Sequence, residues 1–143
     1  MINILSGINA TASALNAERI RMEVIGQNIA NAETKHDVDG KPYQRQEVVF
    51  ERVLDQQQAG APSGIGVSSV RVARIARDQR PPNLVYKPLD KDADADGNVA
   101  MPNISIHEEM ADMIDSSRSY EANLAVVRNA RTMALQTLAI GKR

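Results

Sequence analysis

Both ends of this chain carry apolar residues at a seven-residue spacing, and this pattern constrains the fold more than any other feature. In the first part of the chain, positions seven apart run from Met1 to Ile29, and a second set runs from Ile4 to Ala32. In the last part, alternating four- and three-residue steps run from Ile106 to Leu138. A period of about 3.5 residues places one side chain per turn along a single face of an α-helix. The chain is therefore predicted to pack helix on helix, within itself or with its own copies.

Composition limits the hydrophobic core. The 143 residues include one Phe, three Tyr and no Trp, so the large side chains that usually dominate buried area are scarce. A single domain is the default at this length. Burial must rely on Ala, Val, Ile, Leu and Met, which suits slim helices, and an isolated monomer is expected to be marginally stable.

Charge and cysteine content exclude several classes of function. A net charge of -1, from 17 basic and 18 acidic residues, argues against a general nucleic-acid-binding protein. Without cysteine there is no disulfide scaffold, thiolate nucleophile or Cys-ligated zinc site. No secretory signal precedes the first apolar positions, and no segment approaches the roughly 18 uninterrupted apolar residues of a membrane span. A soluble cytoplasmic protein is expected unless the chain leaves the cell by another route.

The first two zones of the chain differ in character. Residues 1–34 are predicted to form one long helix whose start is capped by Ser6 or Asn9. Residues 35–104 contain turn signals and β-branched runs, which predict a small β-rich insert. The predicted elements of this insert are strands at Gln46–Leu54, Val67–Ile75 and Leu84–Tyr86, with a loop at Gln56–Gly64.

Residues 105–143 carry the signals of a second long helix. No Gly or Pro occurs from Ser105 to Ile140, and Ser105 followed by Glu108 fits a capping box. Glu109 in the first turn and Lys142 and Arg143 at the end complement the helix dipole. The fold class is therefore mainly α with a small β-rich insert. Residues 1–34 and 105–143 are predicted to pair as a coiled-coil domain, with residues 35–104 as a small outer domain.

One local motif resembles a metal site. Asp92 to Gly97 matches the opening of a calcium-binding loop, with oxygen ligands at positions 1, 3 and 5 and Gly at position 6. Position 12, where a bidentate Glu belongs, is Asn103, and position 9 is Ala100. An acidic, solvated turn is therefore favoured, and a calcium-binding module is kept as an alternative.

No catalytic constellation is visible. His36 and His107 are the only histidines, and nothing in the sequence makes them neighbours. Neither a Gly-x-Ser-x-Gly elbow nor a Gly-rich phosphate loop occurs. The chain is predicted not to be an enzyme, with no catalytic, cofactor-binding or metal-binding residues.

Four arginines form a basic segment in the insert. Arg71, Arg74, Arg77 and Arg80 are opposed only by Asp78, and four aspartates follow from residue 90 to residue 96. Ordinary solvated charge is slightly favoured. The alternative is a pair of complementary patches on neighbouring subunits, where such charges fix register and steer association.

Two long stretches resemble a known family. Ser13 to Thr34 (SALNAERIRMEVIGQNIANAET) resembles the N-terminal signature of flagellar axial proteins, the rod, hook and hook-filament junction subunits. Ser117 to Arg143 resembles their C-terminal signature. Within this family, Tyr86 to Tyr120 is similar to a proximal rod protein, and the short middle zone fits because hook and distal-rod relatives carry larger inserts. A sister proximal rod protein is the closest alternative.

The resemblance implies a structural subunit of the bacterial flagellar basal body, with no cofactor. Such subunits polymerise into the hollow rod that crosses the periplasm, transmits torque and forms the export channel. The implied partners are further copies, other rod subunits, inner-membrane ring and rod-base proteins, and the flagellar type III export apparatus. That apparatus exports unfolded subunits without a cleaved signal peptide. The terminal helices of the family are commonly disordered until assembly.

The terminal helices are then predicted to supply the assembly interface. Apolar side chains of the first helix pack against those of the second, and two Asn side chains make polar contacts between subunits. The predicted interface residues are Leu15, Met22, Ile25, Asn28, Ile29, Asn31, Met113, Tyr120, Leu124, Val127 and Leu138. A cytoplasmic helical export adaptor is a further alternative, which predicts helices that are stable in the monomer.

Overall fold

The computed structural model describes residues 4–54 and 68–141 of the chain. Two long helices enclose a β-rich insert in the sequence, so the prediction of a helix-dominated fold with a small insert is confirmed. The elements are α1 (Ile4–Ala30), β1 (Gln46–Leu54), β2 (Ser68–Arg77), β3 (Asn83–Tyr86), β4 (Asn98–Met101) and α2 (Ile106–Ile140). Within the described ranges, no helix is long and apolar enough to span a membrane.

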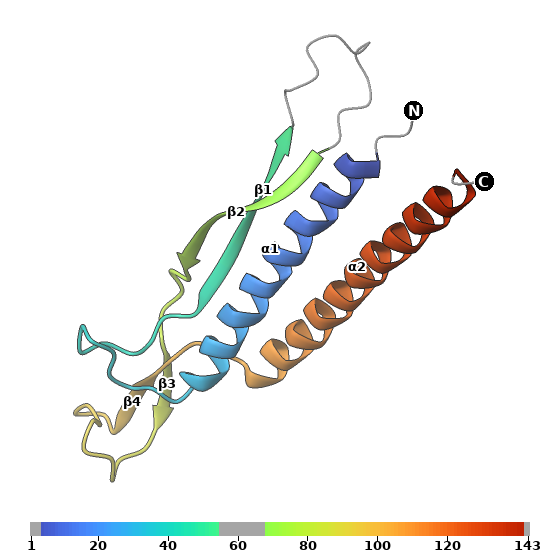
Figure 1. Ribbon diagram of the computed structural model, residues 1–143. Coiled ribbons are helices and arrows are strands. Elements are labelled where there is room, and N and C mark those ends of the chain that lie inside the picture. The colour runs from blue at the N-terminus through green and yellow to red at the C-terminus, as the bar shows by residue number, and fades with distance from the viewer. Residues whose placement is uncertain (1–3, 55–67, 142–143) are drawn as a thin grey trace.

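Helix α1 is the central element of the molecule. It lies between α2 on one side and the β1–β2 hairpin on the other, and it contacts α2, β1 and β2 (Figure 1). The two helices run antiparallel, so the start of α1 and the end of α2 lie at the same end of the molecule (Figure 1). The β3–β4 hairpin lies at the opposite end, where α1 finishes and α2 begins.

The helix boundaries correct part of the sequence prediction. Helix α1 already includes Ser6 and Asn9, so the prediction that one of them caps its start is wrong. The helical spacing of apolar residues extends back to Ile4, and the helix begins at that residue. Its last residue is Ala30, four residues before the predicted end, because the chain enters a turn at Asn31, a residue type that favours leaving a helix.

Helix α2 starts as the sequence predicts. Ser105 is its N-cap residue, with an extended backbone, and its hydroxyl accepts the N–H of Glu108 at 3.4 Å. The helix then runs without a break for 35 residues. Lys142 and Arg143, which were expected to complement the helix dipole, lie outside the described residues.

The insert consists of two antiparallel hairpins. Strand β1 has the predicted bounds and pairs with β2 from Gln46↔Arg77 to Leu54↔Ser68, with an irregularity after Val49. Strand β3 matches the predicted short extended piece and pairs with β4, which the sequence did not predict. The predicted loop at residues 56–64 lies outside the described residues.

The hydrophobic core is small, as the composition predicts. Among the described residues, it consists of side chains from α1, from the segment between α1 and β1, and from β4, and it includes one aromatic ring. The buried apolar residues are Ala17, Val24, Ile25, Ala32, Tyr43 and Val99. Much of the apolar surface of α2 is left uncovered, so the packing of this helix is incomplete within the single chain.

Candidate assembly surface

A buried polar cluster joins α1, β1 and α2, and we call its members Asn28, Tyr43, Arg45, Gln46 and Glu109 the polar junction. The Asn28 side chain, 1% exposed, is its centre. Its Nδ2 donates to the backbone oxygen of Gln46 at 2.9 Å and to Glu109 Oε2 at 3.0 Å. Its Oδ1 accepts the N–H of Gln46 at 2.9 Å and the hydroxyl of Tyr43 at 3.2 Å. All of the hydrogen-bonding capacity of the amide is used within the chain.

The polar junction also holds a buried carboxylate. Glu109 is 1% exposed, and Arg45 Nε donates to its Oε1 at 2.6 Å. Asp112, one turn further along α2, lies 3.5 Å from Arg21 of α1 and 3.7 Å from Arg45. A buried carboxylate is tolerated only when it is paired and hydrogen-bonded, and here both oxygens have partners. Burial also raises the pKa of Tyr43 above its ordinary value.

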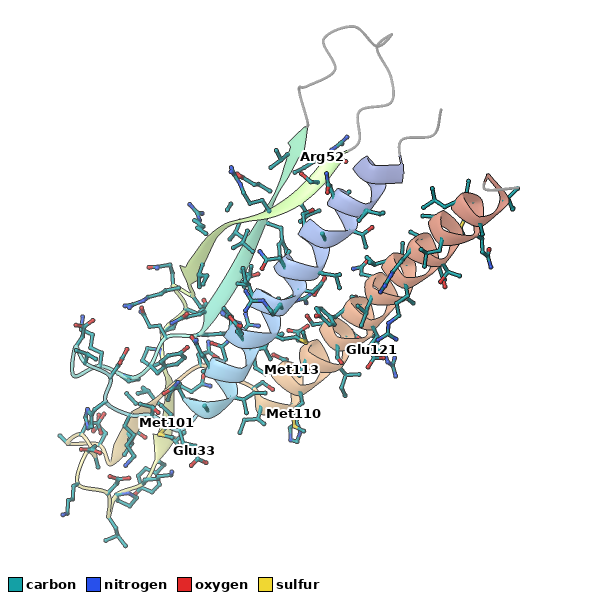
Figure 2. The ribbon with its side chains drawn as sticks, viewed as in Figure 1. Glu33, Arg52, Met101, Met110, Met113 and Glu121 are labelled. Atoms are coloured by element: carbon teal, nitrogen blue, oxygen red, sulfur yellow. The ribbon has the colours of Figure 1, made fainter. Side chains whose placement is uncertain are left out.

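The face of α2 that meets α1 is more polar than predicted. One row of this face, Met113, Tyr120 and Val127, was predicted, and all three side chains are half-buried. Met113 lies between the helices (Figure 2), with its Cε 3.9 Å from the position that a Cβ on Gly26 would take. The neighbouring row contains the buried Glu109 and Ser116. Ser116 Oγ donates to Glu18 Oε2 at 2.6 Å, which fixes the register of the two helices.

The predicted α1 residues lie on the face that carries Glu18. Leu15, Met22 and Ile29 are half-buried, and Ile25 is buried. Their spacing of three, four, seven and eleven residues from Glu18 places them along one side of the helix. The spacing therefore places the predicted stripe on the side of α1 that carries the Glu18–Ser116 contact with α2, and its role between subunits stays a prediction.

The two predicted asparagines differ in their surroundings. Asn28 presents almost no surface to another molecule in this conformation, because the polar junction encloses it. Asn31 is half-buried, and its amide bonds the Gln27 carbonyl at 2.9 Å and the Thr34 hydroxyl at 3.2 Å. A contact between subunits stays a prediction for both residues, and Asn31 is the more accessible of the two.

Helix α2 also carries exposed apolar side chains, which lie on more than one side of the helix. Met110 points away from α1 (Figure 2), and the predicted interface residue Leu138 is 66% exposed, whereas Leu124 is half-buried. Every residue from Leu135 to Gly141 is exposed. Extended apolar exposure of this kind marks an interaction surface. We call the following set, whose members share exposure and not a single helix face, the exposed stripe of α2: Ile106, Met110, Ile114, Val126, Met133, Leu135, Leu138 and Ile140.

Two carboxylates of the acidic turn, those of Asp92 and Asp94, are bonded within the chain. Asp92 pairs with Lys35 and His36, and Asp94 Oδ1 accepts the N–H groups of Asp96 at 3.0 Å and Asn98 at 2.8 Å. Within residues 4–54 and 68–141, no group of three or more His, Cys, Asp or Glu side chains is arranged to hold a metal ion.

The basic segment, which covers β2 and the residues just after it, is partly neutralised by acids of the same chain. Arg71 pairs with Glu51 on the neighbouring strand, and Arg80 pairs with Asp78 at 2.6 Å. The bond with Arg80 lowers the pKa of Asp78 below its ordinary value. These pairs fit the interpretation of ordinary solvated charge.

Two antiparallel terminal helices, a small insert and many uncovered apolar side chains on α2 define a slender, mainly helical protein with a small core. Residues 8–35 match the family described as flagella basal body rod protein, and residues 95–140 match the C-terminal family of flagellar basal body rod FlgEFG proteins. The chain is 39% identical to the flagellar basal-body rod protein FlgC of Borreliella burgdorferi, over 97% of this chain and 98% of the relative. It is 40% identical to FlgC of Bacillus subtilis, over 94% of this chain and 96% of the relative. It is 37% identical to FlgC of Salmonella typhimurium, over 97% of this chain and 98% of the relative.

The chain therefore belongs to the FlgC family of flagellar basal-body rod proteins. These matches extend over nearly the whole length of both proteins, so they include the insert as well as the helices. They favour FlgC over the sister rod protein FlgB, and a rod protein over a calcium-binding module or an export adaptor.

Proposed function

We propose that this chain is a structural subunit of the flagellar basal-body rod and has no enzymatic role. The full-length similarity to FlgC proteins carries this proposal. The exposed stripe of α2 supports it independently, because a helix with so many uncovered apolar side chains gains stability when another molecule covers them.

The terminal helices are the parts of the chain that pack between subunits. Residues 1–34 and 105–143 form the inner, coiled-coil layer of the rod, and residues 35–104 form an outer domain. The heptad spacing supports this arrangement, and so does the small core, because a thin monomer gains most of its burial on assembly. Contacts that do not close into a ring generate a helical tube.

The partners follow from this position in the flagellum. They are further copies of the chain, other rod subunits, inner-membrane ring and rod-base proteins, and the flagellar type III export apparatus. The subunit acts in the periplasmic part of the basal body and arrives there without a cleaved signal peptide. Torque is transmitted along the rod by the same side-to-side helix contacts that build it.

Leu138→Asp tests the role of the exposed stripe. Because Leu138 is 66% exposed, the substitution changes the stability of the monomer little, within about 0.5 kcal/mol. In an assembled rod, however, the new carboxylate is buried against a neighbouring helix, where an unpaired charge is strongly unfavourable. We expect loss of swimming motility and of rods in isolated basal bodies, with the subunit still detected among the exported proteins.

Ala125→Asp is the matched control. Ala125 is exposed on the same helix, and none of the residues three or four positions from it belongs to the exposed stripe, so it introduces the same charge outside that set. We expect this variant to swim. A motile Leu138→Asp strain with normal rods would refute the assignment of the stripe to the assembly interface.

A further inference from the structure

The β3–β4 hairpin is a separate unit at one end of the molecule. Among the described helices and strands, β3 and β4 have close backbone contacts only with each other, although Val99 of β4 is buried. The hairpin projects beyond the helices at the end opposite the termini (Figure 1). Its position relative to α1 therefore depends on contacts made by the connecting segments.

Four charged side chains make such a contact, and we call Lys35, His36, Asp90 and Asp92 the clasp. Lys35 and His36 follow α1, whereas Asp90 and Asp92 belong to the loop between β3 and β4. The Lys35 ammonium binds Asp90 and lies 3.3 Å from Asp92 Oδ2. His36 Nε2 lies 3.0 Å from Asp92 Oδ1. The clasp thus joins segments that are more than fifty positions apart in the chain.

The geometry of His36 requires a particular protonation state. Its second ring nitrogen, Nδ1, lies 3.4 Å from the backbone oxygen of Gly40. Both ring nitrogens therefore face oxygen atoms that only accept hydrogen bonds. A neutral imidazole has a single N–H, so it satisfies one of these contacts, whereas an imidazolium donates to both. The clasp is fully bonded only when His36 carries a proton.

The charges around His36 come from the two segments that the clasp joins. On its own segment, the neighbouring Lys35 opposes protonation, and Asp37 is bonded to the backbone N–H of Val38 at 2.8 Å. On the hairpin side, the bond with Asp92 dominates and raises the pKa of His36 above its ordinary value. The Asp90 carboxylate is held by Lys35, with Lys87 as a further positive neighbour.

We propose that the clasp is a proton-operated latch: protonated His36 holds the β3–β4 hairpin against the segment after α1, and loss of the proton loosens the hairpin. The hairpin is held fully below the ordinary pKa of histidine, and the contribution of His36 is lost as the pH rises through its raised pKa. One pKa is that of His36 with the hairpin held, and the other is the ordinary pKa of histidine. As the pH rises from the ordinary to the raised value, the ratio of closed to open molecules falls in total by about tenfold for each unit of difference between them. The latch stands whether or not the chain is a rod subunit.

The absence of native cysteine makes the latch measurable in the full chain. Gln27→Cys on α1 and Leu84→Cys on β3 place two spin labels at exposed positions, and the distance distribution between them reports the position of the hairpin. Ring-proton NMR of the unlabelled chain gives the pKa of His36. We expect this pKa to lie above the ordinary value for histidine, and the label distance to broaden as the pH rises through it.

Three variants decide the outcome. His36→Gln, which cannot form an imidazolium, is expected to give a distance distribution that is independent of pH in this range. His107→Gln, the matched control at the other histidine, is expected to behave as the parent chain. Asp92→Asn is expected to bring the pKa of His36 down toward the ordinary value for histidine. A hairpin position that does not change through the His36 titration, or a change that persists in His36→Gln, would overturn the proposal.

Discussion

Replacing Asn28 with Ala removes the centre of the polar junction. The substitution deletes four hydrogen bonds: two with the backbone of Gln46, one with the Tyr43 hydroxyl and one with the Glu109 carboxylate. Because Asn28 is 1% exposed, its partners lose their bonds inside the protein and not at the surface. The cost therefore includes the desolvation of groups left without partners.

The size of the effect can be estimated from these bonds. The three bonds between neutral groups contribute about 1 kcal/mol each, and the bond to the carboxylate about 2 kcal/mol, which gives an upper value of about 5 kcal/mol. A cavity of about 260 Å³ beside Asn28, Gln46 and Glu109 has room for water that replaces part of this bonding. We expect a net loss of about 3 kcal/mol, a large share of the roughly 5–15 kcal/mol that stabilises a typical domain.

Urea denaturation of the full chain, followed by far-ultraviolet circular dichroism, measures this loss. Asn31→Ala is the matched control, because Asn31 is half-buried and bonds only groups of its own turn, Gln27 and Thr34. We expect the control to lose less than about 1 kcal/mol, with the same dependence on urea in both variants. Equal losses in the two variants would refute the argument that the polar junction joins the helices to the insert.

Two further substitutions test local parts of the fold. Gly97→Ala is expected to destabilise the β3–β4 hairpin by about 2 kcal/mol, since Gly97 has φ of 78° and a Cβ there would lie 2.9 Å from a ring carbon of Tyr86. Gly40 also has a positive φ, but a Cβ added there meets nothing within 4 Å. Comparing the thermal unfolding of Gly97→Ala with that of Gly40→Ala therefore separates the effect of the clash from that of backbone strain. Ser105→Ala is expected to lose about 1 kcal/mol by removing the bond to the N–H of Glu108, and Ser105→Asp to retain it; similar melting temperatures for these two variants would exclude the cap.

Local patterns predicted the elements that local interactions form. Strand β1 has the predicted bounds, and α2 begins at the predicted cap, because strand propensity and capping depend on residues close together in the sequence. The predicted start of α1 was wrong for a related reason. Ser6 is a good cap in isolation, but the helix continues through Ile4.

The polar junction was the main feature that sequence reasoning missed. Asn28 was assigned to contacts between subunits, and Glu109 was interpreted as an acid that complements the helix dipole. The signal was present, since Asn is unusual inside a helix, but its partners are not adjacent in sequence. Asn28 and Glu109 are 81 positions apart, so their contact depends on the whole path of the chain.

The sequence by itself determined two long helices, a small β-rich insert, a thin core and the resemblance to flagellar axial proteins. It also determined which residues share a helix face, because spacing alone sets that. Only the tertiary structure decided what covers each face: the row with Glu109 and Ser116 meets α1, and the exposed stripe of α2 meets nothing in the single chain. It likewise decided that Asp92 pairs with His36. The physical reason is that periodicity fixes directions within one helix, whereas the neighbour in each direction depends on how the chain returns to it.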